Sequence, residues 1–250
     1  MIARPVKALS SLGLVLLAAA CTNSFEIPIE TPIRPKLDVA AFQRVLVAGF
    51  ISGGTEDVDG NLETTRLLRS QLRTKSQLRV IDSDVLPLVD VASEGRDSGG
   101  AAPAAVPIKE EKDLEAYEHV FANVEYWKKI GEEYQQPLIV TGTVMFTPLQ
   151  RNSIVQREQE VYDSFGRRRV VPVRTYMERK GFSLDGRFIF IDGRSGATLH
   201  SESFGEQILY NANQTTPALS SYFELMDRLI PSFLSTLSSQ KIKGTRILLQ

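Results

Sequence analysis

Serine and paired carboxylates are the side chains of this sequence that could carry out hydrolysis. Ser195 lies in the stretch Asp192–Gly196. A nucleophilic serine of the Gly-x-Ser-x-Gly type needs a turn from strand to helix, whereas this stretch is typical of a turn between two strands. The pairs Glu110–Glu111 and Glu132–Glu133 could serve glycoside cleavage, but adjacent acids on polar helix surfaces are more typical of solubility. We therefore expect no catalytic residue and no enzyme activity.

Nitrogen and sulfur ligands for a metal ion are few. His119 and His200 are the two histidines, and Cys21 is the one cysteine. A zinc site would therefore have to rely on carboxylates, and ordinary side chains on a helix and a strand are the favoured interpretation of both histidines. We expect no metal site and no cofactor.

One acidic loop has part of the spacing of a calcium site. Asp57, Asp59 and Asn61 match the first three ligand positions of such a loop. Leu62 replaces its turn glycine, and Leu68 stands where the bidentate acid belongs. The sequence therefore predicts an ordinary loop without calcium.

Cys21 ends an apolar segment near the N-terminus. Arg4 and Lys7 precede an apolar run from Leu9 to Ala20, which is typical of a signal-peptide core and shorter than the roughly 20 residues of a membrane-spanning helix. Small residues directly before a cysteine resemble the bacterial lipobox, where a signal peptidase cuts ahead of a cysteine whose thiol carries lipid. This resemblance implies a lipoprotein signal peptide over residues 1–20. Cys21 would then carry diacylglycerol as a thioether, and an N-acyl chain.

The match to the lipobox departs at one position. Ala18 stands where that motif usually has leucine, so an ordinary signal peptide cut nearby, or an apolar terminus without this role, is the alternative. Thr22, rather than aspartate, follows Cys21 and resembles the pattern that directs such lipoproteins to the outer membrane. We expect a protein held by its lipid on the periplasmic face of that membrane.

Length and charge bound the remaining possibilities. The chain has 250 residues, of which 42% are hydrophobic, and its formal net charge is −1. This is enough apolar material for a sizeable core. Because nucleic-acid binding needs a basic face, we expect no nucleic-acid partner, and no motif points to a small-molecule substrate.

Composition divides the chain after Cys21. Pro28, Pro32 and Pro35 stand among polar residues and are incompatible with a helix or a central strand. We therefore expect a flexible, lipid-anchored tether over residues 21–43 and a single periplasmic domain over 44–250. Residues 91–112 are charged or small and lack apolar periodicity, which predicts a mobile loop.

Apolar patterning within the domain predicts alternating strands and helices. Continuous apolar runs predict strands at residues 44–50, 78–81 and 138–146. Apolar residues on both sides of the turn at Asp192–Gly196 predict a hairpin over 181–210. Apolar residues at spacings of three and four predict helices over 62–72, 113–134 and 217–237. Arg66, Arg69 and Arg73 are expected on the solvated face of the first helix. This order predicts an α/β (α+β) fold with a mixed sheet flanked by helices.

Residues 151–180 predict an extended β-hairpin, because two extended arms flank the turn signal Asp163–Gly166. The second arm has a mildly apolar face that contains Val171, Val173 and Met177. An arm that crosses a membrane needs apolar residues at every second position over about 9 to 11 residues, so that one face meets lipid. Neither arm has this pattern. We expect the hairpin to contact a protein partner through these three residues and Phe165.

Several strand motifs together resemble a known family. They are Val45–Phe50, Leu78–Ile81, Leu138–Val144 with its central glycine, and Phe188–Asp192 followed by Ser195–Gly196. In this order they resemble the periplasmic module of the curli-secretion lipoprotein CsgG and the N-terminal domain of TolB-type proteins. The resemblance implies a CsgG-like periplasmic domain.

Two functions follow from this resemblance. The first is a non-catalytic, lipid-anchored envelope component that assembles with itself or with partners in secretion or envelope assembly; curli-type pores send hairpins through the outer membrane, which is not expected here. The second is a regulatory binding module for a peptidoglycan synthase, as in the related lipoprotein LpoB, that contacts the enzyme through residues 151–180. A large oligomer would favour the first function. A monomer that captures a synthase would favour the second.

Overall fold

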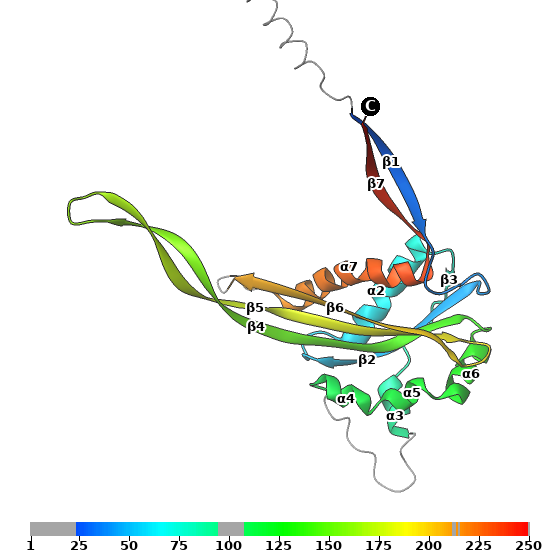
Figure 1. The fold of residues 1–250 in the computed structure, drawn as a ribbon. Helices are drawn as coiled ribbons and strands as arrows, with labels where there is room; N and C mark the ends of the chain where they lie inside the picture. The colour runs from blue at the N-terminus through cyan, green and yellow to red at the C-terminus, as the bar shows by residue number, and fades with distance from the viewer. Residues whose placement is uncertain (1–23, 95–107, 212–213, 215, 250) are drawn as a thin grey trace, which may run out of the picture. The chain divides into compact units, whose positions relative to one another are not determined.

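A computed structural model of the chain describes residues 24–94, 108–211, 214 and 216–249 (Figure 1). These residues form two compact units, Pro35–Ser238 and a smaller unit from the two ends of the described chain. The segment predicted as a signal peptide, Cys21 and residues 95–107 of the predicted mobile loop lie outside the described residues.

The larger unit is built on a five-stranded mixed sheet in the order β3-β2-β4-β5-β6. Its strands are β2 (Arg44–Gly54), β3 (Arg79–Val80), β4 (Leu138–Tyr162), β5 (Arg168–Asp192) and β6 (Thr198–Asn211). β2 is parallel to β3 and β4, while β4, β5 and β6 are successive antiparallel neighbours. Helices cover both faces, which explains why β2 is apolar without alternation. The predicted mixed sheet flanked by helices is confirmed.

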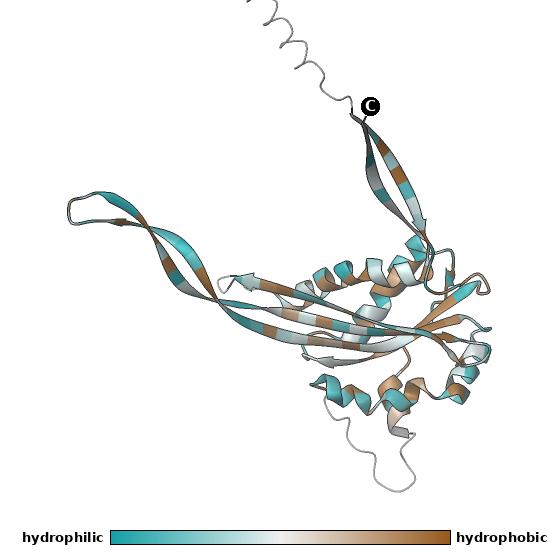
Figure 2. Cartoon of the chain, in the orientation of Figure 1, coloured by the Kyte–Doolittle hydropathy of each residue, from teal (hydrophilic) through white to brown (hydrophobic). Residues whose placement is uncertain are grey.

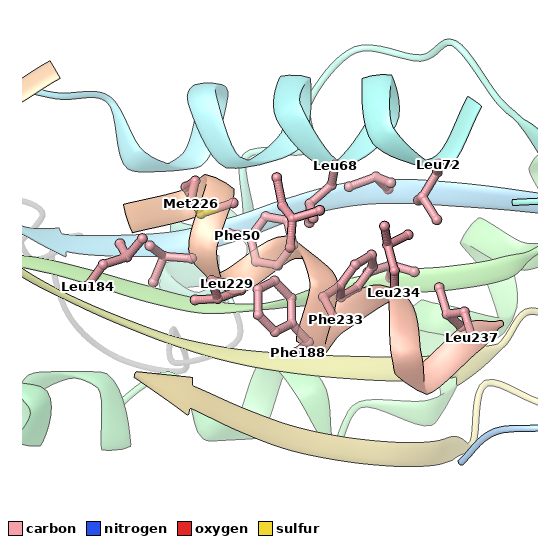
Figure 3. Close-up of a cluster of buried hydrophobic side chains, with 14 of the residues drawn as sticks. Phe50, Leu68, Leu72, Leu184, Phe188, Met226, Leu229, Phe233, Leu234 and Leu237 are labelled. Atoms are coloured by element: carbon pink, nitrogen blue, oxygen red, sulfur yellow. The ribbon is translucent and has the colours of Figure 1, made fainter. Parts of the chain in front are cut away.

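Helices α2 (Gly60–Lys75) and α7 (Ala218–Leu237) cover one face of the sheet. Leu68 and Leu72 of α2 and Phe233 of α7 are fully buried there. They meet side chains of the strands in one cluster, with the ring of Phe188 at its centre (Figure 3). The Phe188 ring lies 5.7 Å from that of Phe50 and 5.0 Å from that of Phe233, measured between centroids.

A buried polar contact joins these two helices. The hydroxyl of Tyr222 on α7 contacts Oγ1 of Thr64 on α2 and donates a hydrogen bond to the Gly60 carbonyl at 3.2 Å. Burial raises the pKa of Tyr222 because desolvation disfavours the phenolate. The phenol therefore stays a hydrogen-bond donor at physiological pH.

Arg69 of α2 differs from its expected place on a solvated face. Its guanidinium donates to the Val47 carbonyl at 2.7 Å and to the Ser83 carbonyl at 2.6 Å. Desolvation lowers the Arg69 pKa from its ordinary value. Arg66 and Arg73 are exposed as predicted. Only the tertiary structure shows that a carbonyl of β2 and a carbonyl of the loop after β3 lie within reach of one arginine of the three.

Four short helices cover the other face of the sheet. They are α3 (Leu88–Glu94), α4 (Glu111–Glu115), α5 (Glu118–Phe121) and α6 (Val124–Glu133). Their apolar side chains form a second core cluster with the opposite parity of β2, β4 and β5. Both described ends of the predicted 91–112 loop are therefore helical, since α3 ends at Glu94 and α4 begins at Glu111.

The single helix predicted over 113–134 is wrong, because the chain turns twice within this range. Asn123 caps the start of α6, and its Oδ1 accepts a hydrogen bond from the Tyr126 backbone nitrogen at 3.1 Å. The indole nitrogen of Trp127 donates to the Val120 carbonyl at 2.9 Å, a group that a continuous helix would have bonded itself. The breaks bring Trp127 into the core, where it is fully buried.

Gly142 gives the central part of β4 a conformation that other residues rarely adopt. Its φ is +149°, and a Cβ atom at this position would lie 1.8 Å from the Arg187 carbonyl oxygen of β5. The glycine noted in the strand motif therefore permits close approach of two backbones. Its role is structural.

The smaller unit is an antiparallel pair of β1 (Ser24–Ile33) and β7 (Gln240–Leu249). This differs from the predicted tether over 21–43 and from the predicted domain over 44–250, because part of the first range is a strand and residues 239–249 lie outside the larger unit. Pro28 and Pro32 are compatible with β1. Their nitrogens face the same edge of the strand, and each strand of a two-stranded pair has one open edge.

Truncation of Phe188 tests the first core cluster. We expect Phe188→Ala to lower the free energy of unfolding by about 3–5 kcal/mol, because a fully buried ring is lost and a cavity remains. Urea unfolding followed by circular dichroism measures this change. Phe165→Ala is the matched control, since that ring is 81% exposed and its loss should change stability by about 0.5 kcal/mol or less. Equal effects of the two substitutions would contradict the assignment.

Candidate interaction site

The candidate site is the outer half of the β4–β5 pair (Figure 1). These strands pair from Leu138 opposite Asp192 to Tyr162 opposite Arg168. The pairing of β2 with β4 ends at Phe146, and that of β6 with β5 ends at Arg179. From Asn152 outward the two strands therefore form a ribbon with two open edges within the described chain. The expected hairpin is thus a continuation of two sheet strands.

Asp163 fastens the turn at the hairpin tip. Its Oδ1 accepts hydrogen bonds from the backbone nitrogens of Phe165 and Arg167, both at 2.9 Å. Its backbone carbonyl accepts from the Gly166 nitrogen at 2.9 Å, and Gly166 has a φ of +75°. This turn leaves the Phe165 ring 81% exposed.

The predicted contact residues fall in two places. Val171, Val173 and Met177 lie on one face of the ribbon and are half-buried, opposite Gln159, Arg157 and Ser153 respectively. Directly opposite residues of an antiparallel pair share a face. Phe165 belongs to the turn instead, so the structure does not bring all four residues into one surface.

Sequence patterning missed an apolar pair on the other face of the hairpin. Ile154 lies directly opposite Tyr176, and these side chains are 72% and 64% exposed. The alternation of the first arm showed no apolar face, because Ile154 is surrounded by polar residues of the same parity. The register between the strands was the missing signal. In Figure 2 the hairpin accordingly shows short hydrophobic segments between hydrophilic ones.

The residues singled out for chemistry have structural contacts. Ser195 is exposed, and its Oγ accepts a hydrogen bond from the Ala197 nitrogen within the same turn, at 3.3 Å. The ring of His119 in α5 contacts the carbonyls of Ala116 at 2.9 Å and Ala92 of α3 at 3.2 Å. His200 lies in β6, as a strand residue. No base therefore faces Ser195 among the hydrogen bonds of the described residues.

The acidic residues are also used locally. Asp113 Oδ2 accepts hydrogen bonds from the backbone nitrogens of Lys109 and Glu110 at the start of α4, both at 2.9 Å. Asp59 caps α2 through the Leu62 nitrogen at 3.0 Å, and Asn61 Oδ1 accepts from the Phe50 nitrogen at 2.7 Å. Within the described part of the chain, no three His, Cys, Asp or Glu side chains are grouped so that they could hold a metal ion.

A cavity of about 380 Å³ lies between α4 and the sheet. Arg187 of β5 forms an ion pair with Glu118 at its wall, and the Arg187 Nε donates to Ser201 Oγ at 3.1 Å. Asp185 accepts a hydrogen bond from Ser183 Oγ at 2.7 Å. These groups bind one another. They do not combine a nucleophile with a base.

A polar cluster that sequence reasoning missed holds the start of the larger unit. Glu202 of β6 pairs with Lys36, contacts His200 Nε2 at 3.3 Å and accepts from Thr236 Oγ1 at 3.1 Å. Burial by itself would raise the Glu202 pKa, but the hydrogen bonds from Lys36, His200 and Thr236 outweigh it, so the pKa is lowered. The Leu37 nitrogen also donates to the Thr236 carbonyl at 3.0 Å.

Comparison with known proteins gives distant matches to solved structures. No protein-family model and no curated protein matches the chain. It is similar to the lipoprotein GNA1162 from Neisseria meningitidis at 14% identity and a TM-score of 0.34, over 76% of this chain and 97% of that one. A PelC dodecamer from Paraburkholderia phytofirmans shows 15% identity and a TM-score of 0.36, over 85% and 98%. A protein described as a neuraminyllactose-binding hemagglutinin homologue from Helicobacter pylori shows 14% identity and a TM-score of 0.37, over 84% of this chain and 90% of that one.

These values leave the resemblance to CsgG and TolB-type proteins a prediction.

In the part of the chain that the structure describes, none of the helices combines the length and the apolar character needed to span a membrane.

Acidification tests the Glu202 cluster. Because the folded-state pKa of Glu202 lies below its ordinary value, its ionisation stabilises the fold above that ordinary value. The contribution is lost as the pH falls through the folded-state pKa. We therefore expect Glu202→Gln to be less stable than the unchanged protein at pH 7, with the difference shrinking below about pH 4.5. Urea unfolding of both proteins from pH 7 to below about pH 4.5 measures this difference in stability. A difference that stays constant with pH would contradict the stabilising role of the Glu202 carboxylate.

Proposed function

We propose that this protein is a non-catalytic bacterial envelope component that is anchored by lipid at Cys21 and acts through contacts of its β4–β5 hairpin with proteins. Envelope assembly or secretion is the process that we infer. The observation that carries the proposal is the ribbon beyond Asn152, whose two strands have open edges.

Open strand edges support a role in protein contact. Each presents backbone N–H and C=O groups that another strand can pair with. The exposed side chains Ile154, Tyr176 and Phe165 add apolar area on the ribbon and at its tip. Two-stranded hairpins are marginally stable by themselves, so a partner that pairs with an edge would also stabilise the ribbon.

The proposal that the protein is not an enzyme rests on how its polar groups are used. Ser195, His119 and Asn61 each bind backbone groups of their own surroundings. Catalysis by a nucleophile would require a base that contacts it and a third group that orients the base. The lipid anchor rests on the sequence around Cys21. Outer-membrane placement rests on Thr22.

Site-specific crosslinking in intact cells tests the hairpin contact. We expect a photo-crosslinking phenylalanine in place of Tyr176 to give discrete adducts, either with a second copy or with another envelope protein. The control is the same group in place of Leu62, which is 49% exposed on α2. Identical adducts from both positions, or none from Tyr176, would overturn the proposed role of the hairpin.

Shortening the hairpin should preserve the fold. We expect a variant in which a tight Asn-Gly turn joins Asn152 to Glu178 to unfold cooperatively in urea. Arg179 and Lys180 must be kept, because they pair with Asn211 and Tyr210 of β6. An unfolded product would show that the sheet needs the outer ribbon.

Metabolic labelling with palmitate tests the anchor. We expect the unchanged protein to incorporate label and to sediment with membranes, because thioether-linked acyl chains partition into the bilayer. Cys21→Ala removes the acceptor thiol and should abolish the incorporation of label. Label that persists on Cys21→Ala would contradict lipidation at this residue.

A further inference from the structure

One face of the hairpin ribbon combines arginines with apolar side chains. The register places the odd-numbered residues of both outer arms together, and we call this surface the arginine face. Its residues are Arg151, Ser153, Val155, Arg157, Gln159 and Val161 of β4 and Arg169, Val171, Val173, Thr175, Met177 and Arg179 of β5. None of these positions is Asp or Glu.

The positive charges of this face are largely unneutralised. No carboxylate of the described residues lies within ion-pair distance of Arg151, Arg157 or Arg179. Arg169 has one such neighbour, Asp163, whose Oδ2 lies 3.7 Å from its Nε. The oxygens of Asp163 also hold the turn, so this carboxylate belongs to the hairpin tip.

The opposite face has a different charge balance. It carries Glu158, Glu160 and Glu178 together with Arg168 and Arg174, and Arg168 forms an ion pair with Glu160. The two faces of one ribbon thus differ in charge although they share the same two strands and the same length. This contrast indicates that the arginine face meets a surface of negative charge.

The apolar residues identify the kind of surface. The arginine face also carries apolar side chains between its arginines, namely Val155, Val171, Val173 and Met177. These side chains are half-buried, whereas Ile154 and Tyr176 on the opposite face are exposed. A polyanion such as a nucleic acid would contact the arginines but leave these side chains without an apolar partner. The boundary between headgroups and acyl chains of a lipid leaflet offers both, because long arginine side chains can reach phosphates while apolar ones enter below them.

We propose that the arginine face of the hairpin lies on an anionic lipid surface and gives the protein a second membrane contact. Val171, Val173 and Met177, which were predicted to contact a protein partner, would then contact lipid. The strand edges, Phe165 and the Ile154–Tyr176 pair remain available for contacts with proteins. The proposal goes beyond the proposed function and does not depend on a lipid at Cys21. Arginines supply charge attraction, and valines and methionine supply apolar burial.

Vesicle binding by the unlipidated chain from Thr22 to Gln250 tests the proposal. This chain holds every residue that the structure describes. We expect it to sediment with vesicles of equal parts phosphatidylcholine and phosphatidylglycerol, and not with phosphatidylcholine alone, with binding that weakens as salt is added. Arg157→Gln with Arg169→Gln should reduce the partition coefficient by about tenfold or more.

The matched control is Arg168→Gln with Arg174→Gln. It removes the same charge from the same hairpin, and each double variant loses one ion pair. We expect it to bind vesicles within about twofold of the unchanged chain, because its substitutions lie on the other face. Equal losses in both variants would show attraction by net charge alone and would overturn the proposal.

A second measurement reports the orientation of the ribbon. The chain from Thr22 onward has no cysteine, so Val173→Cys and Tyr176→Cys each create a single labelling site on opposite faces. A polarity-sensitive dye should shift to shorter wavelength with anionic vesicles at position 173 and not at 176. A shift at 173 without vesicles that grows with protein concentration would identify a second copy as the occupant and overturn the proposal.

Discussion

The antiparallel pairing of β4 with β5 is the interaction on which the rest of this structure depends. At one end of the pair both strands lie inside the sheet, where apolar clusters cover both faces. At the other end the same two strands continue as a ribbon whose outer edges are open. Because an isolated two-stranded ribbon is marginally stable, the buried half supplies the order of the exposed half. The core thus sets the register in which the hairpin presents its side chains.

Register gives the hairpin its two chemically different faces. Side chains alternate along a strand, so a slip of one residue in β4 would bring Glu158 and Glu160 onto the arginine face and turn Arg157 away from it. Gly142 helps to exclude such slips, since its lack of a Cβ atom lets the backbone of β4 approach that of β5 at one position. The contrast between a carboxylate-free face and a mixed face therefore depends on contacts far from the hairpin tip.

Polar residues that could suggest chemistry serve to join elements in this fold. His119 links α5 to α3, Asn61 binds the backbone of β2, and Glu202 joins β6 to Lys36 and Thr236. Buried or half-buried polar groups require such partners, because an unpaired one costs free energy in the fold. In the described part of the chain, the bonding capacity of these three residues is thus used between elements of the fold.

The sequence by itself determined the mixed α/β class, the covered strands and the turn at Asp163–Gly166, because apolar period and turn chemistry are local properties. It did not reveal the breaks in the segment 113–134, since the bond from the Trp127 indole to the Val120 carbonyl forms only when the helices pack. Nor did it pair β1 with β7, whose strands lie at opposite ends of the chain. The arginine face likewise needed the structure: each arm alternates by itself, and only the tertiary register decides which residues of the two arms meet.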